Sequence, residues 1–297
     1  MLTSRNLAFN GSLSQASQLC MDKKATRDCI RHAGIKQVIS PKQACIDAAS
    51  FAQSDQQHSL SLWTTLCQDT DHGGPFIIKP MKDGCSSGIV RINNASDLHT
   101  YCRLVADRAT TIAPNTFHDQ PQPIALSSRA EAMLIEPYIA TDDVRVENQT
   151  LHHIPQTGWL ELTVVVRQQG NKLVAFTPSI TVSESAVLSV EEKFQGGTGI
   201  NLTPPPESLL TQKDVALIQD LVAQCATALG LSQYARMDIF FHRTRKEMIV
   251  IEANTLPALT PSTVLYQQAL VENPPIRPGS FLQQLIQERL VDVVIPA

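Results

Sequence analysis

Apolar residues recur at helical spacing early in the chain and then alternate as they do in strands. Residues 21–35, MDKKATRDCIRHAGI, predict a helix that Gly34 ends, and KQVIS at 36–40 predicts a short strand after it. Residues 74–92 predict a strand, a Gly and Ser loop and a second strand, before a helix opened by Ser96. These elements predict a compact α+β unit.

The later pattern predicts a hinge and a second unit. Residues 109–131 are rich in Pro, Ser and Thr and predict a surface excursion, while residues 140–158 predict another loop. Between them MLIEPYI predicts a strand and a hinge, and LELTVVVRQQGNKLVAFTPSITV predicts a hairpin with its turn at QQGNK. An amphipathic helix closed by Gly230 and a final helix, SFLQQLIQERLVDVV, follow. We therefore expect two domains, residues 1–139 and 140–297.

Composition narrows the class of protein. The chain has 297 residues, 43% of them hydrophobic, which allows a large buried core. A net charge of −4 and a pI near 6.1 argue against a nucleic-acid partner. Seven scattered cysteines without a CxxC pair indicate neither a disulfide framework nor a zinc site. With no signal pattern and no apolar run of roughly 18 residues, we expect a cytoplasmic protein without a membrane partner.

One hairpin carries polar residues among apolar ones. Residues 236–254, RMDIFFHRTRKEMIVIEAN, predict two strands in which Arg236 shares a face with Asp238, and Glu252 shares a face with Asn254. Folding about HRTRK could set Asp238 opposite Glu252, where two carboxylates repel each other unless a cation lies between them. Two carboxylates and an amide oxygen suit Mg²⁺ better than zinc. The alternative is a pair of solvated charges at strand ends.

Three lysines and one hinge are candidates for nucleotide contacts. Lys79 leaves the strand FIIK just before DGCSSG, whose small residues let backbone N–H groups approach a phosphate. Lys23 lies early in its helix, where the helix dipole disfavours a cation, and Lys193 lies in a Gly-rich segment. An ordinary solvated lysine is the alternative for both. The run LIEPYI suits hydrogen bonding to an adenine edge, although a plain buried strand would have the same pattern.

In combination these motifs resemble the ATP-grasp part of the D-alanine:D-alanine ligase family over about residues 9–290. They occur in the family's order: FNGSLSQASQLCMDKKATRDCIRHAGI, PFIIKPMKDGCSSGIVRI, MLIEPYI, GWLELTV, EEKF, and YARMDIFF followed by VIEANTLPALTPS. The resemblance implies an α+β, ATP-grasp fold whose two subdomains bind a nucleotide between them. It also implies a carboxylate–amine ligase for peptidoglycan precursors that uses ATP with Mg²⁺ or Mn²⁺, forms an acylphosphate and takes D-alanine by default.

The resemblance assigns roles to individual positions. The residues that would contact ATP phosphates are Lys23, Lys79 and Lys193. Those that would hold or line the adenine and ribose are Glu136, Tyr138, Ile139, Glu161, Ile77, Phe240 and Ile251. The metal ligands would be Asp238, Glu252 and Asn254. The catalytic positions would be Arg236, which clamps the acylphosphate and the later oxyanion, with Cys85, Ser86 and the backbone N–H of Ala258. Ser262 and Thr263 would grip the carboxylate of the second amino acid.

Several positions depart from the family on the amino-acid side of the site. Cys85 replaces the usual Ser, Phe194 the usual Tyr, Ala258 a Gly and Thr263 a Ser. The sequence also lacks the family's N-terminal domain, which helps to bind the first amino acid. We therefore expect either a fragment of a longer protein or a shortened homologue with a different or lost specificity. The expected partners are a homodimer copy or the missing N-terminal domain. A non-catalytic ATP-binding module and a ligase of altered specificity are the alternative functions.

Overall fold

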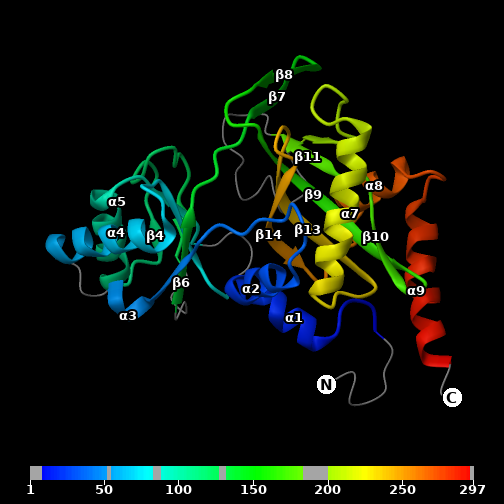
Figure 1. The fold of residues 1–297 in the computed structure, drawn as a ribbon, viewed down its shortest axis with the longest axis horizontal. Coiled ribbons are helices and arrows are strands. Elements are labelled where there is room, and N and C mark those ends of the chain that lie inside the picture. Colours follow the sequence, from blue (N-terminus) through cyan, green and yellow to red (C-terminus); the bar gives the residue numbers. More distant parts are fainter. Residues whose placement is uncertain (1–8, 52–54, 83–87, 127–131, 183–199, 295–297) are drawn as a thin grey trace. The chain divides into compact units, whose positions relative to one another are not determined.

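The computed structural model describes residues 9–51, 55–82, 88–126, 132–182 and 200–294, and these fall into two compact units (Figure 1). The smaller unit contains Met21–Lys24 and Pro41–Ala140, and the larger contains Ala25–Ser40, the chain from Thr141 and the residues up to Cys20. This division differs from the expected single boundary at residues 139 and 140. The N-terminal segments join the larger unit because Ala16, Cys20 and Ile30 pack in its core.

The smaller unit is built on an antiparallel sheet with strand order β1-β6-β2-β3. Its strands are β1 (Ala44–Asp47), β2 (Phe76–Pro80), β3 (Val90–Ile92) and β6 (Ala132–Pro137), with a separate pair, β4 (Thr111–Ile112) and β5 (Ile124–Ala125). Its helices are α3 (Ala48–Phe51), α4 (Gln56–Thr70) and α5 (Ala95–Ala106). The cap of α5 is Asn94 rather than the expected Ser96, because the Asn94 side chain accepts the N–H of Ser96 and of Asp97.

The core of the smaller unit takes alternate residues of its strands. Phe76 and Ile78 of β2 are fully buried against Leu66 of α4 and Leu98 of α5. Because strand side chains alternate, Ile77 and Lys79 lie on the opposite face of the sheet. This face carries the candidate residues of the smaller unit.

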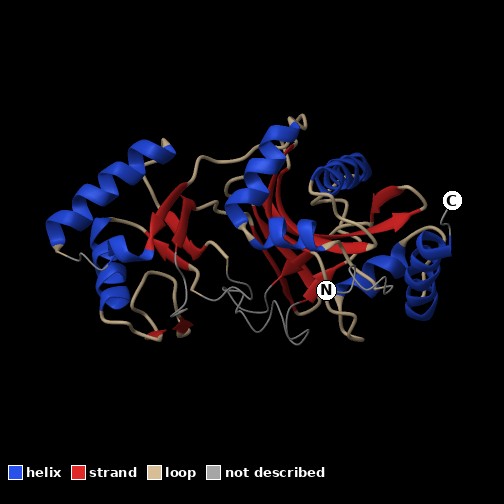
Figure 2. Ribbon diagram, turned by 90° about the horizontal axis from the view of Figure 1, so that it is seen from below, coloured by secondary structure: helices blue, strands red, loops and turns tan. Residues whose placement is uncertain are grey.

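The larger unit is built on an antiparallel sheet with strand order β12-β11-β9-β13-β14, and β10 pairs with β9. Figure 2 shows the strands of the two units as separate sheets. The strands are β9 (Trp159–Gln169), β10 (Lys172–Ala175), β11 (Ser179–Val182), β12 (Ile200–Leu202), β13 (Tyr234–His242) and β14 (Glu247–Asn254), with a hairpin of β7 (Asp143–Glu147) and β8 (Thr150–Ile154). The helices are α1 (Ser14–Met21), α2 (Lys23–Ala33), α7 (Gln212–Ala228), α8 (Val264–Val271) and α9 (Pro278–Val294).

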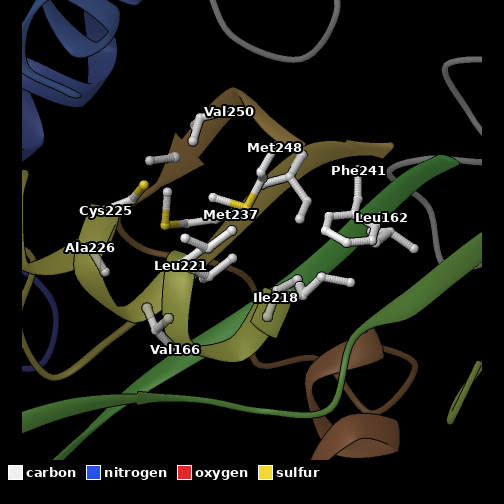
Figure 3. Close-up of a cluster of buried hydrophobic side chains, with 14 of the residues drawn as sticks. Leu162, Val166, Ile218, Leu221, Cys225, Ala226, Met237, Phe241, Met248 and Val250 are labelled. Carbon is white, nitrogen blue, oxygen red and sulfur yellow. The ribbon is translucent and has the colours of Figure 1, made fainter. Parts of the chain in front are cut away.

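The two faces of the larger sheet are covered differently. On one face, alternate residues of β9, β13 and β14 pack against α7 in a continuous core, which includes Leu162, Val166, Met237, Phe241, Met248, Ile218, Leu221 and Cys225 (Figure 3). On the other face, residues of α8 and α9 such as Leu265 and Phe281 pack around Val165 and Tyr234. The side chains of Glu161, Thr163, Asp238 and Phe240 on this second face are partly exposed.

Three local expectations are wrong. Residues 140–158 contain the hairpin β7–β8 instead of a loop, because Asn148 and Gln149 adopt φ values of 50° and 63°, which suit a two-residue hairpin turn. Residues 109–131 contain β4 and β5, and Ile112 packs in the core. The segment KQVIS forms a single bridge from Val38 to Met248 rather than a strand.

Within the part of the chain that the structure describes, no helix is long and apolar enough to cross a membrane.

A buried aspartate holds the hairpin β7–β8 against β9. The Asp142 side chain is 0% exposed, and its Oδ1 accepts the N–H groups of Gln156, Thr157 and Gly158 at 2.9, 2.9 and 2.7 Å. Its Oδ2 lies 3.0 Å from Nε2 of His153. Burial raises the pKa of this carboxyl, but the hydrogen bonds from Gln156, His153, Gly158 and Thr157 together outweigh burial and lower the pKa to about 2. Folding therefore favours the ionised form.

We expect Asp142 to make folding acid-sensitive. Its pKa in the folded protein lies below the ordinary value of 3.8, so its contribution to stability is present above that value and is lost as the pH falls toward 2. The contribution is about 2 kcal/mol. In Asp142→Asn the free energy of unfolding, measured with urea between pH 5 and pH 2, should fall less steeply. Asp220→Asn, at an exposed position on α7, controls for the loss of one charge. An unchanged pH slope in Asp142→Asn would contradict the assignment.

Candidate functional site

Strands β13 and β14 bring the acidic residues together as predicted. Asp238 pairs directly with Glu252, and Arg236 pairs with Asn254. Asp238 lies in the middle of its strand and its side chain is 15% exposed, while that of Glu252 is 29% exposed. This carboxylate pair is therefore not a pair of solvated charges at strand ends.

A β-bulge sets this opposition. The register shifts between Asp238 and Ile239, so that Ile239 pairs with Val250 while Asp238 pairs with Glu252, and Ile251 is left without a partner in the ladder. In a regular strand Glu252 would follow Met248 and Val250 into the core, because side chains alternate. The bulge absorbs one residue, so Glu252 turns to the face of Asp238. Bulges re-aim side chains in this way beside functional sites.

Strand β9 supplies further polar side chains to the same face. Thr163 pairs with Asp238 and its Oγ1 donates a hydrogen bond of 2.5 Å to Asp238 Oδ1. Glu161 pairs with Phe240, one pair further along the same face. Thr163 is a site residue that the sequence analysis missed. The signal was present in ELT of GWLELTV, because residues two apart on a strand share a face.

Arg236 balances the charge of the two carboxylates. Its Nη2 lies 3.0 Å from Asp238 Oδ2 and 3.8 Å from Glu252 Oε1, and its side chain is 20% exposed. Asn254 donates from Nδ2 to Glu252 Oε1 at 3.2 Å. The expectation that opposed carboxylates need a cation is therefore met by a guanidinium within the same hairpin. Their opposition alone does not require a metal ion.

Three further candidates lie on the segment that joins β14 to α8. Ala258 and Ser262 are exposed, and Thr263 is partly buried at the cap position of α8, where its side chain makes no capping hydrogen bond. The backbone N–H of Thr263 instead donates to the carbonyl of Thr260 at 3.0 Å. The hydroxyls of Ser262 and Thr263 take no part in capping α8, so the fold places no such demand on them.

In the smaller unit, Lys79 and Glu136 form a buried ion pair. The two residues are 4% and 8% exposed, and Lys79 Nζ lies 2.5 Å from Glu136 Oε1. Register explains the contact: Ile77 pairs with Glu136 and Lys79 with Leu134, so all four side chains share the face opposite the core. The sequence suggested separate roles for Lys79 and Glu136, and the structure couples them.

The remaining candidates of this unit lie around the ends of β2 and β6. Lys23 donates from Nζ to the carbonyl of Pro80 at 3.3 Å, directly after Lys79. Tyr138 donates its backbone N–H to Pro75 O at 2.9 Å, and the guanidinium of Arg91 lies 4.2 Å from the centre of its ring. Ile139, next along the chain, is partly buried. The sheet thus carries Ile77, Lys79 and Glu136. Tyr138 and Ile139 follow directly after β6, and Lys23 reaches the end of β2 from the first turn of α2.

Some predictions fall outside the described residues. These are Cys85, Ser86 and Lys193, together with the substituted position Phe194. Across the described ranges, no group of three or more His, Cys, Asp or Glu side chains is placed to hold a metal ion. The set Asp238, Glu252 and Asn254 contains two carboxylates and an amide.

Two α+β units with these antiparallel sheets define the class, which is the ATP-grasp fold. The D-alanine–D-alanine ligase from Coxiella burnetii superposes with a TM-score of 0.64 at 16% identity, over 98% of this chain and 63% of that one. The ligase from Bacillus anthracis, solved in complex with ATP, superposes with a TM-score of 0.61 at 17% identity, over 98% and 73%. These similarities establish the fold.

Sequence comparison finds similarity to the D-alanine–D-alanine ligases. Residues 155–287 match the family described as D-ala D-ala ligase C-terminus. The D-alanine–D-alanine ligase of Desulforudis audaxviator is 26% identical over 255 residues, covering 86% of this chain and 64% of the relative. That of Oceanobacillus iheyensis is 23% identical over 260 residues, covering 88% and 56%. The chain is similar to these D-alanine–D-alanine ligases over most of its own length, as its motifs predicted, and it spans about three-fifths of the length of these two.

The hydrogen bond from Thr163 should stabilise the site. Thr163→Val replaces the hydroxyl with a methyl group of similar shape and leaves Asp238 without this donor. Because a hydrogen bond to a charged group contributes more than a neutral one, we expect the free energy of unfolding to fall by about 1.5 kcal/mol. Urea unfolding would measure the loss. The control is Thr150→Val, at an exposed position of β8, which should change stability by less than about 0.5 kcal/mol. Equal effects in both variants would contradict the role of Thr163.

Proposed function

We propose that this chain binds ATP with a divalent cation and forms part of a ligase that joins a carboxylate to an amine. The observation that carries the proposal is that three oxygen donors, Asp238, Glu252 and Asn254, share a sheet face that is not part of the α7 core, within the region that matches the ligase family. D-alanine is the proposed substrate, because the relatives are named for it.

The donor set fits a hard divalent cation. Asp238 and Glu252 offer carboxylate oxygens from paired positions, and Asn254 lies beside Glu252 and adds an amide oxygen. Oxygen donors without sulfur or imidazole favour Mg²⁺ or Mn²⁺ over zinc. When bound, such an ion would neutralise charge on the nucleotide phosphates during phosphoryl transfer. The residues that would hold it are these three.

The chain's own side chains would do the rest of the binding. Lys79 and Lys23 bring two positive charges to the end of one strand, where they suit phosphate oxygens. Phe240 and Ile251 on the larger sheet, with Ile77 on the smaller, offer apolar surface for the base, and Glu161 offers a carboxylate for the ribose hydroxyls. We assign these groups to two ATP-grasp subdomains that correspond to the two compact units rather than to a single boundary at residues 139 and 140.

Arg236 would act on the reacting atoms. Attack of a substrate carboxylate on the γ-phosphorus forms an acylphosphate and releases ADP, and attack of an amine on the acyl carbon then releases phosphate. Each step concentrates negative charge on oxygen atoms. A planar guanidinium can donate two parallel N–H hydrogen bonds to such oxygens. Ala258, Ser262 and Thr263, which follow the metal-ligand strand, would contact the amino acids through a backbone N–H and two hydroxyls.

Nucleotide binding should depend on the metal. In Glu252→Ala, ATP affinity in the presence of Mg²⁺ should fall at least tenfold, since one of two charged ligands is lost. Glu247→Ala is the matched control on the same strand, because Glu247 pairs with Arg245 at the turn and not with Asp238. Titration calorimetry would measure both variants and the parent protein with and without EDTA. Equal ATP affinity of the parent protein in EDTA and in Mg²⁺ would contradict the metal assignment.

Turnover should distinguish a ligase from a binding module. With ATP and Mg²⁺, phosphate release should rise on addition of D-alanine and remain near background with L-alanine, and mass spectrometry should detect a dipeptide. D-lactate and other D-amino acids complete the panel. If ATP binds but none of these acids stimulates phosphate release, the chain is an ATP-binding module rather than a ligase. If another acid is preferred, D-alanine is the wrong substrate and the ligase class stands.

A further inference from the structure

Arg236 lies where it would meet the proposed metal ion. It shares the outer face of β13 with Asp238, two residues away, and its Nη2 lies within 3.0 Å of one proposed ligand and 3.8 Å of the other. The Asp238 carboxylate is held from both sides, by Arg236 on Oδ2 and by Thr163 on Oδ1. The same two carboxylates therefore attract a guanidinium and, under the proposed function, a divalent cation.

The two cations compete for these oxygens. A divalent ion bound to Asp238 and Glu252 would lie beside a guanidinium that already contacts both carboxylates, and two like charges at contact distance repel each other strongly in a partly buried site. The hydrogen-bonding capacity of the Arg236 guanidinium is also incompletely used. The Nε atom of Arg236 is buried, and it has no hydrogen-bond partner among the residues that the structure describes. An N–H in that situation loses little when the side chain moves.

We infer that Arg236 is an internal counter-ion, which the divalent cation must displace before the site is competent. In the metal-free protein it screens the repulsion between Asp238 and Glu252 and so keeps the hairpin paired. When the metal takes over those carboxylates, the guanidinium is released toward the reacting oxygens that it is proposed to clamp. Arg236 is thus a positioning residue for the metal site as well as a proposed catalytic residue. The inference rests on the proposed function, since it presupposes that the metal binds here.

The test is metal binding without nucleotide. Mn²⁺ is the probe, because the electron paramagnetic resonance signal of the free ion reports the unbound concentration directly. In Arg236→Gln the competing charge is gone, so the protein should bind Mn²⁺ at least threefold more tightly than the parent. Unchanged or weaker binding would overturn the inference.

The matched control is Arg245→Gln. Arg245 lies at the turn of the same hairpin and pairs with Glu247 at 2.7 Å, so its loss changes the net charge equally without freeing Asp238 or Glu252. This variant should bind Mn²⁺ within twofold of the parent. An equal gain in both variants would mean that net charge alone controls affinity, and the inference would fail.

Two more variants keep the result interpretable. Circular dichroism shows whether Arg236→Gln folds. If it does not, Arg236→Lys decides: lysine keeps the charge but lacks the planar guanidinium, so this variant should bind Mn²⁺ more tightly than Arg245→Gln does, and equal affinities of the two variants would refute competition. Asp238→Asn tests the metal site itself. Parental Mn²⁺ affinity in Asp238→Asn would remove the metal from the proposed function. Loss of affinity there, with no gain in the Arg236 variants, would overturn only the displacement.

Discussion

The fold of the candidate site depends on one irregularity in a strand, the bulge at Ile251. Strand alternation alone would direct Glu252 to the same face as Met248 and Val250, which is the face that packs against α7. A carboxylate there would be buried without partners, at a cost that few folds tolerate. The extra residue moves Glu252 to the other face and leaves Ala253, a small apolar residue, to complete the core. One local insertion therefore reconciles a packed core with an acidic site.

In both units the ion pairs lie on the sheet face that does not pack into the main core. In the larger sheet Arg236 lies on Asp238, and in the smaller sheet Lys79 lies on Glu136, each pair on the face that does not pack into the main core. Buried ion pairs are poor sources of stability, because removing both charges from water offsets most of their attraction. Between β2 and β6, a hydrophobic pair of similar size in place of Lys79 and Glu136 would hold the strands together equally well. Under the proposed function, the cation of each pair would contact the nucleotide or the substrate.

The sequence correctly predicted those structural features that depend on residue type and on spacing between nearby residues. The α+β class, the helix of α2, the hairpin β9–β10 and the opposition of Asp238 and Glu252 all follow from alternation and turn residues. What it could not predict depends on packing across the chain. The contact of Thr163 with Asp238 joins residues 75 positions apart, and the assignment of residues before Cys20 to the larger unit follows from side chains that meet its core.

Other misses had a local signal. In the hairpin β7–β8, Val144 and Val146 alternate with polar residues just before a possible two-residue turn. The exposed polar residues of the hairpin nevertheless made this segment resemble a loop. The bulge is a different case. The sequences RMDIFF and VIEAN are compatible with a regular register and with a bulged one. The bulged register is adopted because it keeps Glu252 out of the core.

The separation of faces also explains how the fold persists at identities of 16% to 26%. A core face requires apolar side chains of suitable volume, and many combinations satisfy that requirement. The opposite face carries the polar side chains of the candidate site, such as Asp238 and Glu252. Ala258, Ser262 and Thr263 belong to neither category: two are exposed, and Thr263 caps α8 without using its hydroxyl. Substitutions on this segment do not alter the core, so under the proposed function the contacts to the amino acids could change here without disturbing the fold of the larger unit.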